Sequence, residues 1–295
     1  MSGLLGKVVR IDSEGAAPSL ASLPEVASQV ASQWKISRAS TVKPGECRLL
    51  FPAQSHPIAG VASGEQPRAP QTGPDSLPPK NVFLRNERLE WTRLAAAKCV
   101  RALRELGKIN GEKQVIEVDS FSSSHAAAVG AILGLWNVNH FKTRGPMPGW
   151  DLPLDKQGGR HISIAPMKGL ASQDEKKSLR DEDDDLCSTG TPLSWYTGEV
   201  YAHAQNWSRE LQEVPANLMS PTIFSERVVN AFKNVPHTQV MIRDAKWARE
   251  QNMNLFLSVA QGSEQPCKFV EIHYHGAPEH HSAPLALVGK GITFD

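Results

Sequence analysis

Short aliphatic runs alternate with helix-like segments along this chain, and this alternation limits the fold more than any other feature. Strand-like runs occur at residues 4–11, 48–51, 81–84, 114–118 and 161–164, and their length and composition are typical of strands. Helix-like segments lie between several of them. Strands that alternate with helices predict a three-layer α/β unit, in which helices cover a sheet on both faces.

Apolar residues at helical spacing identify the clearest of these helices. The stripe predicts a helix that continues to Leu106 and ends before Gly107, a residue type common at helix C-termini. Residues 20–34 and 125–136 predict two more helices, and the serines at 122–124 are good N-caps for the second. The residues of the stripe are Leu89, Ala96, Val100, Leu103 and Leu106.

Two segments interrupt the alternation. Residues 52–80 are rich in proline, glycine and serine, which predicts an exposed, disordered loop because each proline removes a hydrogen-bond donor and fixes φ. Residues 181–185 are five consecutive acidic residues, whose mutual repulsion favours a solvated loop; the spacing of a calcium-binding EF-hand loop is absent. We therefore expect an N-terminal α/β domain at 1–170, an acidic linker at 171–194 and a second domain at 195–295.

The second domain shows the same alternation. A long helix is expected from Trp195 to Glu213, stopped by Val214-Pro215, and another follows the N-cap Ser220. Strands are expected at 239–242, 255–260, 268–274 and 285–288, with a short helix at 245–251. This pattern predicts a second α/β sheet, of which the chain holds the first part.

The last eight residues, Val288 to Asp295, carry the candidate site. Gly289 and Gly291 flank Lys290, and Asp295 ends the run. A lysine and a carboxylate after a central strand lie where open α/β sheets bind ligands. The alternative without a ligand site is that Lys290 faces solvent and Asp295 is an ordinary terminal residue. A phosphate-binding Walker loop is excluded, because glycine follows Lys290 where that motif has serine or threonine.

Four segments resemble, in the same order, the leucine (cytosol) aminopeptidases, a family of two-metal peptidases. They are Asn206 to Leu211 with Pro215 to Thr222, Phe256 to Ser263, Glu271 to Tyr274, and Val288 to Asp295. The family usually has glycine where this chain has Asn254, so asparagine is expected to adopt the left-handed turn there.

The resemblance implies an N-terminal macro-like α/β domain followed by a zinc-peptidase-like catalytic domain. It also implies a homohexamer that acts on peptides with two divalent ions, zinc, manganese or magnesium, which polarise the scissile carbonyl and activate water. Lys290 would donate an amine nitrogen to one ion, and Asp295 carboxylate oxygen to both. The family's other ligands and its catalytic residues would follow Asp295, so no catalytic residue lies within this chain, which is expected to be an inactive fragment.

The composition limits which binding partners and which cellular compartment are expected for this chain. The net charge of +1 gives no basic surface for nucleic acid, and no apolar run approaches the length of a membrane span. Cys47, Cys99, Cys187 and Cys267 are widely separated in the sequence, which favours reduced thiols over a disulfide framework. We therefore expect a cytoplasmic protein.

Three other functions remain open. His273, His275, His280 and His281 could form a zinc site, although the resemblance places the first of them in an ordinary strand. A short relative could lack catalysis and act in binding or assembly. The macro-like domain could bind a nucleotide, but it lacks an evident glycine-rich phosphate loop.

Overall fold

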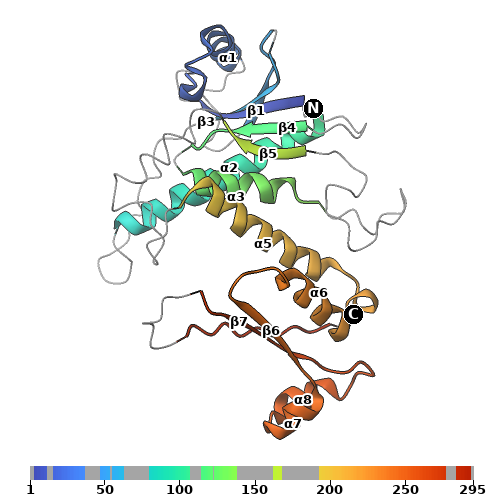
Figure 1. Cartoon of the computed structure of the whole chain (residues 1–295). Helices are drawn as coiled ribbons and strands as arrows, with labels where there is room; N and C mark the ends of the chain where they lie inside the picture. Colours follow the sequence, from blue (N-terminus) through green and yellow to red (C-terminus); the bar gives the residue numbers. More distant parts are fainter. Residues whose placement is uncertain are drawn as a thin grey trace. The chain divides into compact units, whose positions relative to one another are not determined.

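The computed structural model of the chain forms two compact units, Met1–Trp207 and Ser208–Asp295 (Figure 1). The structure describes residues 3–11, 16–36, 47–53, 55–62, 80–106, 114–121, 123–137, 162–167, 193–276 and 284–293.

A five-stranded sheet organises the first unit, with the strand order β2-β3-β1-β4-β5. Strands β3, β1, β4 and β5 are parallel, and β2 joins the edge of β3 in the antiparallel direction. Lys7 of β1 lies beside Glu117 of β4, and their side chains form an ion pair at 3.0 Å. The strands are β1 (Gly3–Ile11), β2 (Cys47–Leu50), β3 (Ile58–Ala62), β4 (Gln114–Val118) and β5 (Ile162–Pro166).

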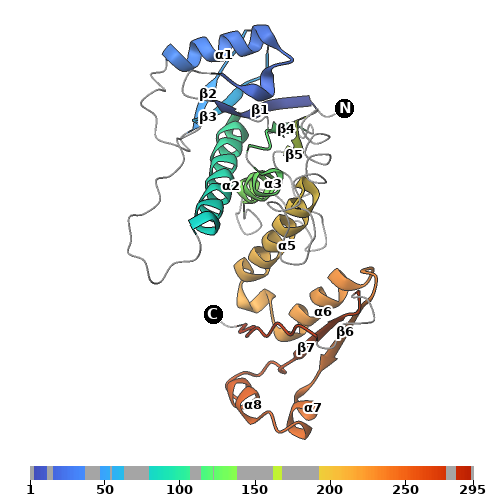
Figure 2. The same cartoon turned by 90° about the vertical axis from the view of Figure 1, so that its left-hand side faces the viewer.

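Helices cover both faces of this sheet. Helix α1 (Pro24–Ile36) lies on one face, and α2 (Lys80–Leu106) and α3 (Ser124–Leu135) lie on the other (Figure 2). Neighbouring strand residues contribute to opposite cores, since Val8 packs towards α2 and α3 whereas Val9 packs towards Trp34 of α1. The period-2 alternation of a strand buried on both faces thus builds the expected three-layer α/β architecture, and the predicted fold class is confirmed.

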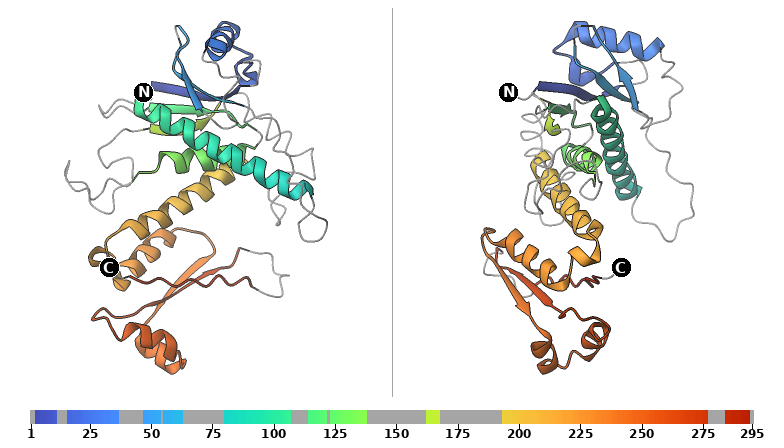
Figure 3. Two further views of the ribbon diagram at one scale, coloured as in Figure 1. Left: turned by 180° about the vertical axis from the view of Figure 1, so that it is seen from behind. Right: turned by 90° about the vertical axis from the view of Figure 1, so that its right-hand side faces the viewer.

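Helices α2 and α3 pack side by side at very short range (Figure 3). A Cβ atom on Gly130 would lie 2.0 Å from the carbonyl oxygen of Arg93, so glycine is what permits this approach. Ser123 caps α3 by accepting a hydrogen bond from the backbone N–H of Ala126 at 3.2 Å. This N-cap lies within the serine run where the sequence placed it.

The long helix α5 (Trp195–Glu213) matches the predicted bounds. Its first turns belong to the first unit. There Trp195 joins the core between the sheet and helices α2 and α3, and Ala202 packs with Ile132 and Leu133. The expected acidic linker lies largely outside the described residues, so the predicted domain boundaries stay a prediction.

The second unit is built around a two-stranded antiparallel sheet of β6 (Thr238–Arg243) and β7 (Phe269–Tyr274). Helix α6 (Pro221–Phe232) precedes β6, and its N-cap is Ser220 with Pro221 in the first turn, as predicted. Between the strands lie α7 (Ala245–Glu250) and α8 (Asn254–Ala260). Short 3-10 helices occur at Pro18–Leu20 and Ala216–Leu218.

Three expected elements are wrong. Residues 81–84 belong to helix α2 rather than to a strand, because no glycine or proline separates them from the helical stripe that follows. Residues 255–260 form α8, since a short apolar run is compatible with a helix as well as a strand. Residues 58–62, inside the expected loop at 52–80, form β3 and lie next to the central strand β1; the residues after β3 in that loop, 63–79, lie outside the described part.

The expected turn at Asn254 is also wrong. The residue with left-handed backbone is Asn252, with φ 57°, whereas Asn254 is the first residue of α8. An asparagine still supplies the turn, in agreement with the tolerance of this residue type for positive φ. Across the described residues, no helix is both long and apolar enough to cross a membrane.

Candidate functional site

Lys290 lies in an extended, irregular segment at residues 284–293 of the second unit. The expected strand at 285–288 is wrong, because no described strand pairs with this segment and its side chains find no core. Leu285 is 87% exposed and Val288 96% exposed. Lys290 is exposed as well, so it does not lie at the end of a central strand.

The second expected ligand, Asp295, lies outside the described residues, and so do His280 and His281. Among the residues that are described, no group of three or more His, Cys, Asp or Glu side chains could hold a metal ion. A two-metal centre needs several carboxylate, imidazole or amine ligands around both ions. The described residues therefore do not form that centre by themselves.

A cluster of polar side chains lies on the β6–β7 sheet of the second unit. Glu271 accepts a hydrogen bond from Nε of Arg243 at 2.8 Å and pairs with Nε2 of His273 at 3.1 Å. These two partners, Arg243 first, lower the pKa of Glu271. The guanidinium of Arg243 also lies 5.3 Å from the ring of Trp247, and the His273 and His275 rings stack at 6.2 Å. These contacts satisfy Glu271 within the protein and connect β6 to β7.

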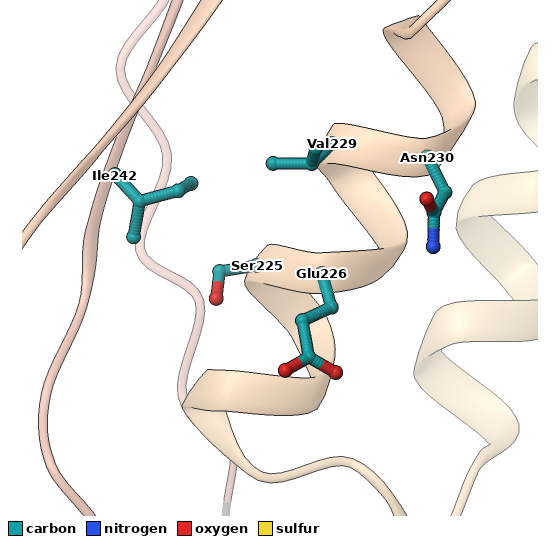
Figure 4. A pocket seen from close by; sticks show the side chains of 5 residues that line it. All are labelled: Ser225, Glu226, Val229, Asn230 and Ile242. Atoms are coloured by element: carbon teal, nitrogen blue, oxygen red, sulfur yellow. The ribbon is translucent and has the colours of Figure 1, made fainter.

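A small hollow of about 240 Å³ separates α6 from β6. Figure 4 shows Ile242 of β6 facing Val229 and Ser225 of α6, with Glu226 and Asn230 on the same helix but farther from Ile242. Ligand sites usually have about 300–1,000 Å³ and several convergent polar groups. The hollow is smaller, and Ser225 already donates its hydroxyl proton to the carbonyl of Thr222 at 2.8 Å, so this geometry identifies no substrate site.

The region that contains Lys290 is similar in sequence to a known protein family. The sequence model of the catalytic domain of the cytosol aminopeptidase family matches residues 206–295. The cytosol aminopeptidase of Sus scrofa is 36% identical over 211 residues, which are 71% of this chain and 33% of that protein. This chain belongs to the leucine (cytosol) aminopeptidase family. It spans about a third of the length of the curated relatives that it matches.

Other members of the aminopeptidase family agree with this assignment. The cytosol aminopeptidase of Homo sapiens is 35% identical over the same length, again 71% of this chain and 33% of that protein. The enzyme of Dictyostelium discoideum is 41% identical over 101 residues, 33% of this chain and 19% of that protein. The high identity over 101 residues shows that the resemblance extends well beyond a single short motif.

Two solved structures share the fold of this chain. Leucyl aminopeptidase from Trypanosoma cruzi superposes with a TM-score of 0.56 at 16% identity, over 92% of this chain and 45% of that chain. The bottromycin maturation enzyme BotP in complex with Mn gives a TM-score of 0.56 at 15% identity, over 90% and 44%. At this identity the superposition shows the α/β fold alone.

Sequence patterns missed two features of these units. The Arg243–Glu271 pair joins residues 28 positions apart, and only the register of β6 with β7 brings them together. Cys47 and Cys99 are even farther apart in the sequence, yet both pack in the same core of the first unit. No spacing rule could have found either pair, because both depend on how strands and helices pack.

Proposed function

We propose that this chain is part of a metal-dependent aminopeptidase of the leucyl aminopeptidase type, which removes N-terminal residues from peptides. The observation that carries the proposal is the match of residues 206–295 to the family's catalytic domain. The 36% identity with a cytosol aminopeptidase over 211 residues supports it. Because this chain spans only about a third of the length of such relatives, it would supply only part of the active site.

Lys290 and Asp295 are the ligands that we assign within this chain. In the proposed site, Lys290 gives an amine nitrogen and Asp295 gives carboxylate oxygens to a pair of divalent ions. The complex of BotP with Mn supports manganese as one such ion, and zinc and magnesium remain further candidates. The remaining ligands and the catalytic groups would be supplied by sequence beyond this chain, which alone would be inactive.

The extended segment around Lys290 is consistent with an incomplete site. Its aliphatic side chains are almost fully exposed, although residues of this type usually pack in a core. In the complete enzyme we expect this segment to become a strand and to bring Lys290 next to further carboxylates. We also propose that the complete protein is a cytoplasmic homohexamer, as the family resemblance implies.

A peptidase assay tests the proposal. Hydrolysis of leucine p-nitroanilide with added Mn²⁺ would be measured for this chain and for a version extended to the full length of its relatives. We expect activity in the extended version alone. In that version, Lys290→Ala and Asp295→Asn should each lower kcat/KM by at least about 100-fold, since loss of even an outer-shell partner of a metal ligand typically costs 10–100-fold.

A matched lysine controls for charge and length. Lys233, which follows α6 in the same unit and is also exposed, should be replaceable by alanine without loss of activity. Activity of the short chain would refute the claim that it is incomplete. Full activity of the extended Lys290→Ala or Asp295→Asn variant would refute the assignment of that residue as a ligand.

A non-catalytic role in binding or assembly is the second candidate. The observation that favours it is the lack of a metal-holding group among the described residues, together with the exposure of Lys290. Calorimetric titration with Mn²⁺ separates the two functions. An extended chain that forms stable oligomers but binds no Mn²⁺ would support the non-catalytic role.

A further inference from the structure

Two cysteines from distant parts of the sequence lie together in the first unit. Cys47 is the first residue of the edge strand β2, and Cys99 lies in the second half of α2. Cys99 is fully buried in the core below the sheet, and the half-buried Cys47 packs against the same core. Helix α2 packs directly against β2, which brings the two thiols close enough to influence each other, and both cysteines are free.

The two sulfurs have unequal surroundings. The hydrogen bond with Cys99 lowers the pKa of Cys47, assisted by the positive charges of Arg48 and Lys98. Burial raises the pKa of Cys99, and its partner Cys47 raises it further. A partly accessible thiol that ionises first, next to a second thiol that stays protonated, is the arrangement of a reactive and a resolving cysteine.

We propose that Cys47 and Cys99 form a peroxide-sensitive dithiol that closes to a reversible disulfide between β2 and α2. This modification site is separate from the proposed metal site and does not depend on the aminopeptidase function. The expected oxidant is hydrogen peroxide or another small peroxide. The disulfide would fix the edge strand of the sheet to the helix that covers it.

The reaction balances in two steps. The Cys47 thiolate attacks one peroxide oxygen, the O–O bond breaks, and the released hydroxide takes up a proton to leave as water. The product is a sulfenic acid on Cys47. The sulfur of Cys99 then attacks the sulfur of Cys47, the S–O bond breaks, and the Cys99 proton leaves with hydroxide as a second water. One peroxide is thereby reduced and two thiols are oxidised.

Thiol mapping of the intact chain tests this site. The protein would be treated with one equivalent of hydrogen peroxide, alkylated with a maleimide and digested for mass analysis. We expect two of the four thiols to become unreactive, a linked pair of peptides that contain Cys47 and Cys99, and full reversal by dithiothreitol. Closure should also raise Tm by on the order of 5–10 °C, as for other disulfides that close a long loop.

Substitutions separate the roles of the two thiols. Cys47→Ser should abolish the linked peptide and slow peroxide-dependent thiol loss by about tenfold or more. Cys99→Ser should leave a sulfenic acid on Cys47 that dimedone traps. If Cys99→Ser fails to fold, the Cys47→Ser variant and the peptide map of the chain without substitutions still test whether the Cys47–Cys99 disulfide forms. Cys267→Ser, which changes a free thiol of the second unit, is the matched control and should leave the yield of the linked peptide unchanged.

Two results would overturn the proposal. One is faster oxidation of Cys267 than of Cys47. The other is a Cys47 that reaches the sulfinic acid, or links to Cys187, without forming a bond to Cys99.

Discussion

The two units of this chain use similar aliphatic segments with opposite results. In the first unit, Val8 and Val9 of β1 are both fully buried, because β3 and β4 flank the strand and helices cover its two faces. In the second unit, Leu285 and Val288 lie in an equally aliphatic run and are 87% and 96% exposed. The sheet there has two strands, and the last residues of β7 are exposed.

This difference shows that an apolar run becomes a strand only where neighbours pair its backbone and cover its side chains. A strand that lacks a partner leaves one N–H and one C=O per residue to water, and gains little from burial. The run at 285–288 has the composition of a strand without such neighbours among the described residues. The candidate ligand Lys290 follows it, so the site depends on contacts that these residues do not supply.

Truncation of one leucine in each unit should give the largest difference in stability between the two units. Leu103→Ala removes a fully buried side chain from α2 and should lower the free energy of unfolding by about 3 kcal/mol, within the range for buried leucines. Leu285→Ala should change it by less than about 0.5 kcal/mol, as expected at an exposed site. Urea denaturation followed by circular dichroism measures both. Equal losses would contradict the burial of Leu103 and the exposure of Leu285.

The serine N-caps of α3 and α6 allow a second comparison of the two units, with smaller expected changes in the free energy of unfolding. Ser123 is buried and caps α3, whereas the half-buried Ser220 caps α6 through a longer hydrogen bond to the N–H of Ile223, at 3.4 Å. Ser123→Ala should cost about 1.5 kcal/mol and Ser220→Ala about 0.5 kcal/mol, within the range for caps. The same urea titrations measure the costs. Glycine at either position should recover most of the loss, which separates capping from packing.

The smallest expected effect concerns pH and the β6–β7 sheet. Because the pKa of Glu271 is lowered by Arg243 and then by His273, its folded value lies below its unfolded value. The carboxylate therefore stabilises the sheet above the ordinary glutamate range, and this contribution is lost as the pH falls through the lowered value. Carbon-detected NMR titration of Glu271 should show the low midpoint.

Arg243→Gln provides the control for this titration. It should move the midpoint of Glu271 back towards the value of an ordinary glutamate, because the first cause of the shift is gone. An unchanged midpoint in Arg243→Gln would show that the ion pair between β6 and β7 does not form.

Much of the architecture follows from local sequence signals. The bounds of β4 and α5, the cap at Ser220 and the three-layer fold were all predictable, since strong periodicity and capping residues act over a few positions. Residues 255–260 were predicted wrongly because so short a run of mostly apolar residues fits a helix or a strand equally well. Strand β3 was missed because prolines surround it and its stability comes from pairing with β1 and β2.

By itself, the sequence determined the alternation of strands and helices, the residue pattern that resembles the aminopeptidases, and the candidate pair Lys290 and Asp295. Only the tertiary structure decided which apolar runs are buried, and it alone brought Cys47 to Cys99 and Arg243 to Glu271. The physical reason is the distance along the sequence over which each interaction acts. Caps and periodicity act within one element, whereas burial, ion pairs and thiol contacts require elements from distant parts of the chain to meet.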